Sequence, residues 1–303
     1  MQTNITNHIY IMKNISLTLL FLLTLVACET MTFTDEDTTT QTKGEKEMYF
    51  RCTGFNMTEY GEMTKSSSNQ EYTDHILLGI FDSNGNPVSE IIYQHKDDTS
   101  ISYGSFTHTL KYGTYTILTL GWNGGQQCIV KDLENITFSE GWVPHTFLCR
   151  KNIVVSEAYS DTRTLSLKRC VAKFTLKCLD KSIPKETAAF TFRFSKAGKT
   201  LNSETQHCTK TEDFERTIET NGKINTPLSI NTYCFLPGDS TSVEIGVSAY
   251  DKAGNLLGER TILDVPMRIN YSTTYSGNFF PIGDVNSSVS FEHEFDGEIN
   301  CEF

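Results

Sequence analysis

Side chains with ligand oxygens at one-residue spacing occur twice in the sequence, in FDSNGNP at residues 81–87 and in YDKAGNL at 250–256. Such spacing opens a calcium loop of the EF-hand type, in which carboxylate and amide oxygens bind the ion. Here Gly85 stands two places too early, Tyr93 takes the position of the bidentate acid, and Ala253 replaces the middle ligand of the second copy. Calcium binding is therefore not expected at either stretch.

The same two stretches carry the residues of a tight β-hairpin. Asn84-Gly85 and Ala253-Gly254 can supply the positive φ that such a turn needs. Each follows a run of β-branched and aromatic residues, 76–81 in the first case and 245–250 in the second. The repeat predicts one structural hairpin that is built twice.

A second chemical signal is Cys28, which follows a short positive start and an apolar run from residue 15 to 27. This run is shorter than the roughly 20 residues of a membrane span, but it fits a secretory signal. The residues Leu25-Val26-Ala27-Cys28 resemble the bacterial lipobox. The resemblance implies that 1–27 is a lipoprotein signal peptide and that Cys28 carries lipid such as palmitate. The alternative is an ordinary signal-peptidase site that contains a cysteine.

The segment after Cys28 is rich in threonine and acidic residues, with few apolar side chains to bury. Such a composition predicts a disordered tether over residues 28–47. Fully extended at about 3.3 Å per residue, the stretch 29–47 would reach roughly 60 Å.

The charge of the chain is strongly negative, at −11 for the whole sequence. Removal of residues 1–27 takes away one lysine and no acid, so the mature chain would carry −12. This charge argues against nucleic acid and against electrostatic adhesion to anionic lipid, because both attract basic surfaces.

Nine cysteines are present, eight of them after Cys28, and no pair has the C-x-x-C spacing of a zinc site or redox motif. In an exported chain, disulfides are favoured over buried free thiols. Three of the eight fall before residue 156 and five after it. With odd numbers on both sides, the sequence predicts either one disulfide between domains or at least one free thiol in each.

Alternation of apolar and polar residues runs through nearly every ordered stretch, and residues 190–194, FTFRF, show it most clearly. Period two with frequent turn signals predicts an all-β chain of antiparallel sandwiches. The length favours two domains. We expect an N-terminal β-sandwich over 48–155 and a C-terminal β-sandwich over 156–303.

The stretch 165–178, LSLKRCVAKFTLKC, changes parity near Lys168-Arg169. One extra residue would restore a common buried face, which predicts a β-bulge or a bend at that point. We expect this stretch to be the first strand of the second domain.

Motifs of known catalytic chemistry are absent from the sequence, including G-x-S-x-G, H-E-x-x-H, phosphate-binding loops and Rossmann fingerprints. We therefore expect no enzyme activity, no cofactor and no metal ligands. Trp122 and Trp142 could stack on a sugar ring. The alternative, partly buried rings at strand ends, is favoured.

The order of these features resembles the FimB/Mfa-type minor fimbrium anchoring subunits, fimbrillin-like lipoproteins of the Bacteroidales. The similarity rests on the lipobox, the tether and strand-derived motifs over nearly the whole mature chain, namely ILLGIFDSNGNPV, LKYGTYTILTLGWN, LSLKRCVAKFTL, VPMRINYSTTYSGNFF and FDGEIN. The resemblance implies two tandem transthyretin-like sandwiches, a lipid-anchored place at the cell outer membrane, and a role in cell adhesion, fimbrium assembly and length control.

The partner implied by this resemblance is a fimbrial stalk subunit, bound by β-strand addition. Residues 288–295, SVSFEHEF, have the alternation that strand addition requires. The same residues could complete their own sheet, and this intramolecular pairing is favoured. The competing function is a surface glycan-binding lipoprotein of a polysaccharide-uptake system, which should expose two or three coplanar aromatic rings.

Overall fold

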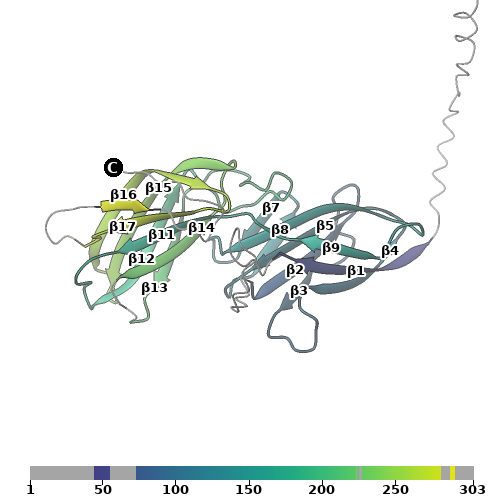
Figure 1. Ribbon diagram of the computed structural model, residues 1–303, viewed down its shortest axis with the longest axis horizontal. Helices are drawn as coiled ribbons and strands as arrows, with labels where there is room; N and C mark the ends of the chain where they lie inside the picture. The colour runs from purple at the N-terminus through teal and green to yellow at the C-terminus, as the bar shows by residue number, and fades with distance from the viewer. Residues whose placement is uncertain (1–43, 55–72, 223, 225–226, 281–286, 291–303) are drawn as a thin grey trace, which may run out of the picture. The chain divides into compact units, whose positions relative to one another are not determined.

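The computed structural model describes residues 44–54, 73–222, 224, 227–280 and 287–290, all within one compact unit, Thr42–Phe303. Every regular element among these residues is a β-strand (Figure 1). This confirms the predicted all-β class, whereas the transthyretin-like topology stays a prediction. None of the described residues forms a helix that is long and apolar enough to cross a membrane.

Two facing sheets form the first sandwich, one with strand order β4-β1-β9 and the other with order β10-β8-β5-β2-β3. Strand β1 runs antiparallel to β4 and parallel to β9. The strands are β1 Glu45–Thr53, β2 His75–Phe81, β3 Ile92–His95, β4 Ser105–Lys111, β5 Gly113–Trp122, β8 Thr146–Val155, β9 Thr162–Ser166 and β10 Lys168–Arg169.

The core of the first sandwich lies between these two sheets. Phe50 from β1 packs in one cluster with Leu78 from β2, Ile117 from β5 and Phe147 from β8, and all four side chains are buried. Because alternate residues of each strand enter this cluster, period two places one face of every strand in the core.

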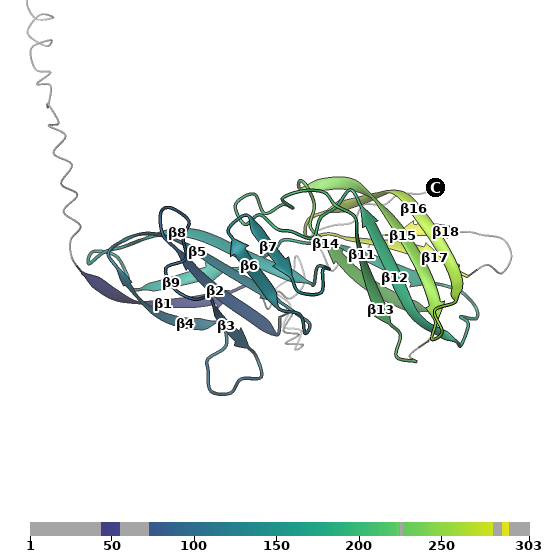
Figure 2. The ribbon, with the colours of Figure 1, turned by 180° about the vertical axis from the view of Figure 1, so that it is seen from behind.

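The second sandwich is built from sheets of order β14-β11-β17-β18 and β13-β12-β15-β16 (Figure 2). Strand β11 runs parallel to β17, whereas β17 and β18 are antiparallel. The strands are β11 Ala172–Cys178, β12 Thr187–Ser195, β13 Phe214–Glu219, β14 Leu228–Cys234, β15 Ser240–Asp251, β16 Leu256–Arg268, β17 Ser272–Gly277 and β18 Ser287–Ser290.

The aromatic alternation in β12 defines the core of this second sandwich. Phe190, Phe192 and Phe194 are fully buried, as the sequence pattern predicts. On the opposite face, Thr191 and Arg193 point away from the core, and the Arg193 guanidinium pairs with Glu215 of β13 at 2.6 Å. Stacking of Phe194 on Phe214, with ring centroids 5.0 Å apart, joins β12 to β13.

A third apolar cluster covers the outer face of the five-stranded sheet. Its members from that sheet include Leu77 and Leu118, and they pack with the hairpin of β6 (Cys128–Asp132) and β7 (Asn135–Phe138). Leu201 and Phe235, from connections between strands of the second sandwich, belong to the same cluster. The five-stranded sheet is therefore buried on both faces.

The segment that links the sandwiches differs from the prediction. Strand β9 pairs with β1 and strand β10 pairs with β8, so residues 162–169 belong to the sheets of the first sandwich. Strand β11 then joins a different sheet. Lys168-Arg169 form the short strand β10, and the strand is interrupted at Leu167 and again at Cys170-Val171, so no β-bulge or bend lies at the predicted pair itself. Residues 165–169 pair with strands of the first sandwich and not of the second. The boundaries 48–155 and 156–303 stay predictions.

A buried polar contact lies at this link. The Arg169 guanidinium donates from Nε to His145 Nε2 at 2.7 Å and from Nη1 to the Asn270 side-chain oxygen at 2.6 Å. The His145 ring stacks on Tyr233 of β14 at 5.1 Å. Burial and the nearby Arg169 charge lower the pKa of His145 well below its usual value, so this imidazole is neutral.

The predicted disulfides are absent from the described part of the chain. All seven cysteines there are free thiols, at Cys52, Cys128, Cys149, Cys170, Cys178, Cys208 and Cys234. Free thiols occur in both sandwiches, which agrees with the second of the two cysteine predictions.

Candidate functional site

The first repeated turn is a hairpin tip with an internally satisfied carboxylate. Asp82 Oδ1 accepts hydrogen bonds from the backbone N–H groups of Asn84 at 2.8 Å and Asn86 at 2.9 Å. Gly85 has a φ of 80°, a conformation that glycine adopts without strain. These hydrogen bonds lower the pKa of Asp82.

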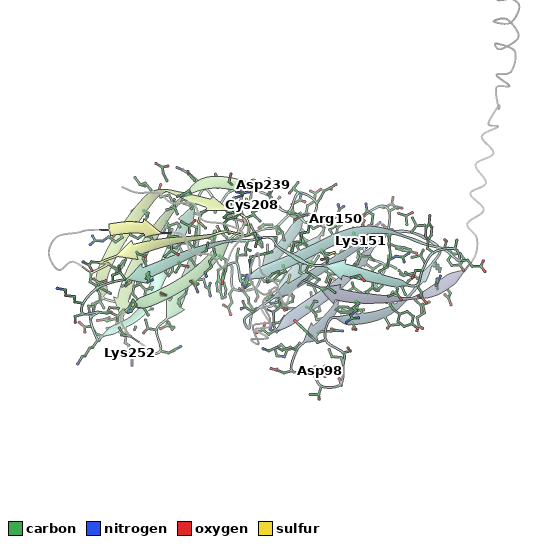
Figure 3. The ribbon with its side chains drawn as sticks, in the orientation of Figure 1. Asp98, Arg150, Lys151, Cys208, Asp239 and Lys252 are labelled. Atoms are coloured by element: carbon green, nitrogen blue, oxygen red, sulfur yellow. The ribbon has the colours of Figure 1, made fainter. Side chains whose placement is uncertain are left out.

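The second repeated turn has the same geometry. Asp251 Oδ1 accepts from the N–H groups of Ala253 and Asn255, both at 2.8 Å, and Gly254 has a φ of 84°. Lys252 lies at the outer end of this hairpin (Figure 3). The prediction of one hairpin built twice is confirmed, and both acids are used to close a turn.

Trp122 is not available to a sugar. Its side chain is 2% exposed, and its indole N–H donates to the Gln126 carbonyl oxygen at 2.9 Å. The His75 ring stacks on it with centroids 5.1 Å apart and an interplanar angle of 10°. The favoured expectation, a buried ring at a strand end, is confirmed for Trp122.

Trp142 is half-buried and has one face covered. The Arg216 guanidinium carbon lies 3.8 Å from the centre of its ring, and the indole N–H donates to Glu140 Oε2 at 2.8 Å. Burial lowers the pKa of Arg216 to about 10, so the cation persists at neutral pH. Trp122 and Trp142 together therefore form no exposed pair of coplanar rings.

The strand predicted for assembly pairs within its own sheet. Strand β18 lies antiparallel to β17, with Gly277 opposite Ser287 and Thr274 opposite Ser290. This confirms intramolecular pairing for residues 287–290, whereas residues 291–295 lie outside the described part. Strand β18 is the edge of its sheet, and edge strands present backbone groups to other chains.

A carboxylate that the sequence pattern did not single out holds the chain beyond β17. Asp180 is buried, and its two oxygens accept from the backbone N–H groups of Phe279 at 2.8 Å and Phe280 at 2.9 Å. Both phenylalanine rings pack into the core of the second sandwich, against Phe190. The chain end of β17 is thus fixed by contacts that do not involve β18.

Cys28, the signal peptide and the tether up to residue 43 lie outside the described residues. Lipid attachment at Cys28 therefore stays a prediction. Residues 45–47 form the start of β1 and pair with β4, so the prediction of a disordered tether is wrong for these three positions.

Comparison with known families gives one match over most of the chain. The model of a family of unknown function, DUF6562, matches residues 39–303. No curated protein matches the chain.

Among solved structures, a candidate adhesin from Bacteroides ovatus has 10% sequence identity and a TM-score of 0.51, with 83% of this chain and 96% of that chain covered. A candidate polysaccharide-binding protein from Bacteroides thetaiotaomicron has 10% identity, coverage of 80% and 95%, and a TM-score of 0.47. A fimbrial assembly protein from Parabacteroides distasonis has 10% identity, coverage of 82% and 96%, and a TM-score of 0.40. The likeness to the Bacteroides ovatus chain confirms, at the level of fold, the resemblance drawn from the sequence motifs.

Proposed function

We propose that this chain, which belongs to the DUF6562 family of unknown function, is an outer-membrane lipoprotein that anchors a fimbrium or serves as one of its accessory subunits. The observation that carries the proposal is the edge formed by β17 and β18. Fold alone does not assign a function, so the argument rests on this edge.

Strand β17 is supported on one side by six residue pairs with β11 and on the other by four pairs with β18. The end of β17 is fixed separately, by the bonds from Phe279 and Phe280 to Asp180. Departure of β18 would therefore leave β17 formed by its pairing with β11, while the backbone N–H and C=O groups that had faced β18 would lack partners. A segment of a fimbrial stalk subunit with period-two alternation could occupy that edge, with affinity from backbone hydrogen bonds.

Attachment to the outer membrane is assigned to lipid on Cys28. The negative charge of the chain offers no electrostatic attraction to anionic lipid. Lipid chains can supply the attachment, because each buried methylene contributes about 0.8 kcal/mol. The tether predicted between Cys28 and the start of β1 at Glu45 would then hold the sandwiches away from the membrane, at the cell surface.

The competing function, glycan binding in a polysaccharide-uptake system, receives less support. It needs exposed rings, but Trp122 is buried and Trp142 has Arg216 over one face. The proposed function therefore places no weight on these two side chains.

Two variants test the role of the lipid and the role of the β17–β18 edge separately. The substitution Cys28→Ala should leave both sandwiches folded but release fimbriae into the medium or allow them to grow to uncontrolled length. Deletion of residues 287–303 should leave the protein on the membrane and change its capture of stalk subunits.

The proposal would be abandoned if loss of the protein left fimbrial length and retention unchanged while residues 44–303, which include all of β1, bound a defined glycan through Trp122 or Trp142. The variants Trp122→Phe and Trp142→Ala serve as controls, and neither should alter fimbriae.

A further inference from the structure

Two imidazoles and one carboxylate converge at the end of the β2–β3 pair. His75 of β2 lies opposite His95 of β3, with ring centroids 4.6 Å apart, and Asp74 directly precedes His75. One ligand atom from each of Asp74, His75 and His95 lies within 4.8 Å of the other two. Imidazole nitrogen and carboxylate oxygen together are a ligand set of divalent transition metals.

Asp74 is held in place by the backbone of the neighbouring loop. Its two carboxylate oxygens accept from the Gly124 N–H at 3.1 and 3.2 Å, and its own N–H donates to the Trp122 carbonyl oxygen at 3.1 Å. The His75 Nε2 lies 3.7 Å from Asp74 Oδ1, which is too long for a hydrogen bond. The imidazole and the carboxylate are therefore close to each other without being hydrogen-bonded.

His75 is oriented by the ring of Trp122, on which it stacks. Trp122 is itself fixed by burial and by its bond to Gln126. Such surrounding contacts orient metal ligands in known sites.

His95 has an acidic neighbour on its far side. Its Nδ1 accepts from the Asp97 N–H at 3.3 Å and lies 3.7 Å from Asp97 Oδ2. Because Nδ1 accepts this hydrogen bond, it carries no proton in the metal-free chain. If Nε2 of His95 bound a metal, the proton would move to Nδ1, and the Asp97 N–H bond would be replaced by a contact with the Asp97 carboxylate. Carboxylate, histidine and metal in that order are a recurring arrangement around zinc.

We propose that Asp74, His75 and His95 bind one divalent transition metal ion, of which zinc is the test case. Ligand atoms about 2.1 Å from an ion in a tetrahedral site are about 3.4 Å apart, and the three atoms here lie within 4.8 Å of one another, so a small movement of the side chains would bring them to that spacing. Their side chains are 27%, 26% and 41% exposed, which leaves room for that movement and for a fourth ligand from solvent.

The site goes beyond the proposed function, because neither lipid attachment nor strand addition needs a metal. Calcium and magnesium fit it poorly, since both prefer a shell of oxygen ligands. The fluorescence of Trp122 can report on binding, because an ion bound to His75 would lie close to the indole on which His75 stacks.

The first experiment titrates ZnCl2 into the chain carrying Cys28→Ala and follows heat release and thermal unfolding. One ion should bind per chain with a rise in melting temperature. The variants His75→Ala and His95→Gln should each weaken binding at least tenfold. The matched control is His207→Ala, because His207 Nε2 also faces a carboxylate, Asp239, at 3.2 Å, but among the described residues no second histidine completes a ligand cluster there. Figure 3 labels Asp239, the carboxylate partner of this control histidine, and the nearby Cys208.

The second experiment uses Ni²⁺, which quenches nearby indoles, in a Trp142→Phe background where Trp122 is the remaining tryptophan. Fluorescence should fall with saturation at one ion, and His95→Gln should abolish the fall while keeping the circular dichroism of the parent. Failure of zinc to bind, or binding and quenching that survive both histidine changes, would overturn the site. Neither outcome bears on fimbrial anchoring, so the metal site and the proposed function can be refuted independently of each other.

Discussion

The Asp180 carboxylate accepts a 2.8 Å hydrogen bond from the backbone N–H of Phe279, which lies 99 residues further along the chain. A second bond, from Phe280, uses the other carboxylate oxygen. One buried acid thereby joins the end of β11 to the chain beyond β17, next to the edge proposed for assembly.

Replacement of this acid should be costly. We expect Asp180→Ala to lower the free energy of unfolding by about 2 to 5 kcal/mol, because two buried N–H groups lose their acceptor. Urea unfolding measures the change. Asp239→Ala is the control, since its side chain is 94% exposed and its loss should have an effect within about 0.5 kcal/mol. Equal effects of the two changes would contradict the role given to Asp180.

The buried thiols should be unreactive in the folded chain. Burial raises the pKa of Cys52 to about 12, with a further contribution from Cys149, and burial raises the pKa of Cys178 to about 12. At pH 8 the thiolate fraction of such a group is about one in ten thousand. A disulfide reagent should therefore label both residues slowly in buffer and rapidly in urea, as read by peptide mapping. Non-reducing maps that show either residue in a disulfide would refute this prediction.

Calcium should leave the melting temperature unchanged, because the carboxylates of both hairpin tips already accept backbone hydrogen bonds. The measurement is thermal unfolding with and without millimolar CaCl2. Binding at a hundredfold excess over the dissociation constant would add about 2.7 kcal/mol. A rise of that kind, lost in Asp82→Asn, would show that the tip is an ion site.

The hairpin acids predict a specific pH dependence. Hydrogen bonds lower the pKa of Asp251 in the folded chain, so the unfolded chain takes up its proton first as the pH falls. The stabilisation is therefore present above the unfolded pKa, near 3.9, and is lost as the pH falls through the lower folded value. The stability difference between the parent and Asp251→Ala should shrink between about pH 5 and pH 2. A difference that stays constant over this range would exclude the mechanism.

Much of the fold follows from local patterns in the sequence. The rings of 190–194 predict which face of β12 is buried, since a strand has only two faces. The hairpin tips were predictable because Gly85 and Gly254 can adopt the positive φ that each of these turns requires. The alternation of apolar and polar residues could not predict which sheet residues 162–169 join, because the pairing partners of a strand depend on distant segments of the chain.

Contacts between distant segments account for the residues that the sequence did not reveal. Asp180 sits in a stretch without a recognisable motif, and its partners follow about a hundred residues later. His75 and His95 are twenty positions apart and meet because β2 and β3 pair in antiparallel register. Free thiols, too, could not be told from disulfides by counting cysteines.

The two parallel strand pairs have a mechanical consequence. In the first sandwich β1 lies parallel to β9, and in the second β11 lies parallel to β17. A pulling force applied at the N-terminal end of β1 and at the C-terminal end of β17 would pull the two strands of each parallel pair in opposite directions along their length. The hydrogen bonds of each pair would then be loaded together in shear and could not open one by one. Single-molecule pulling between those two points should accordingly require higher force than pulling across the β15–β16 hairpin, whose bonds would open in sequence.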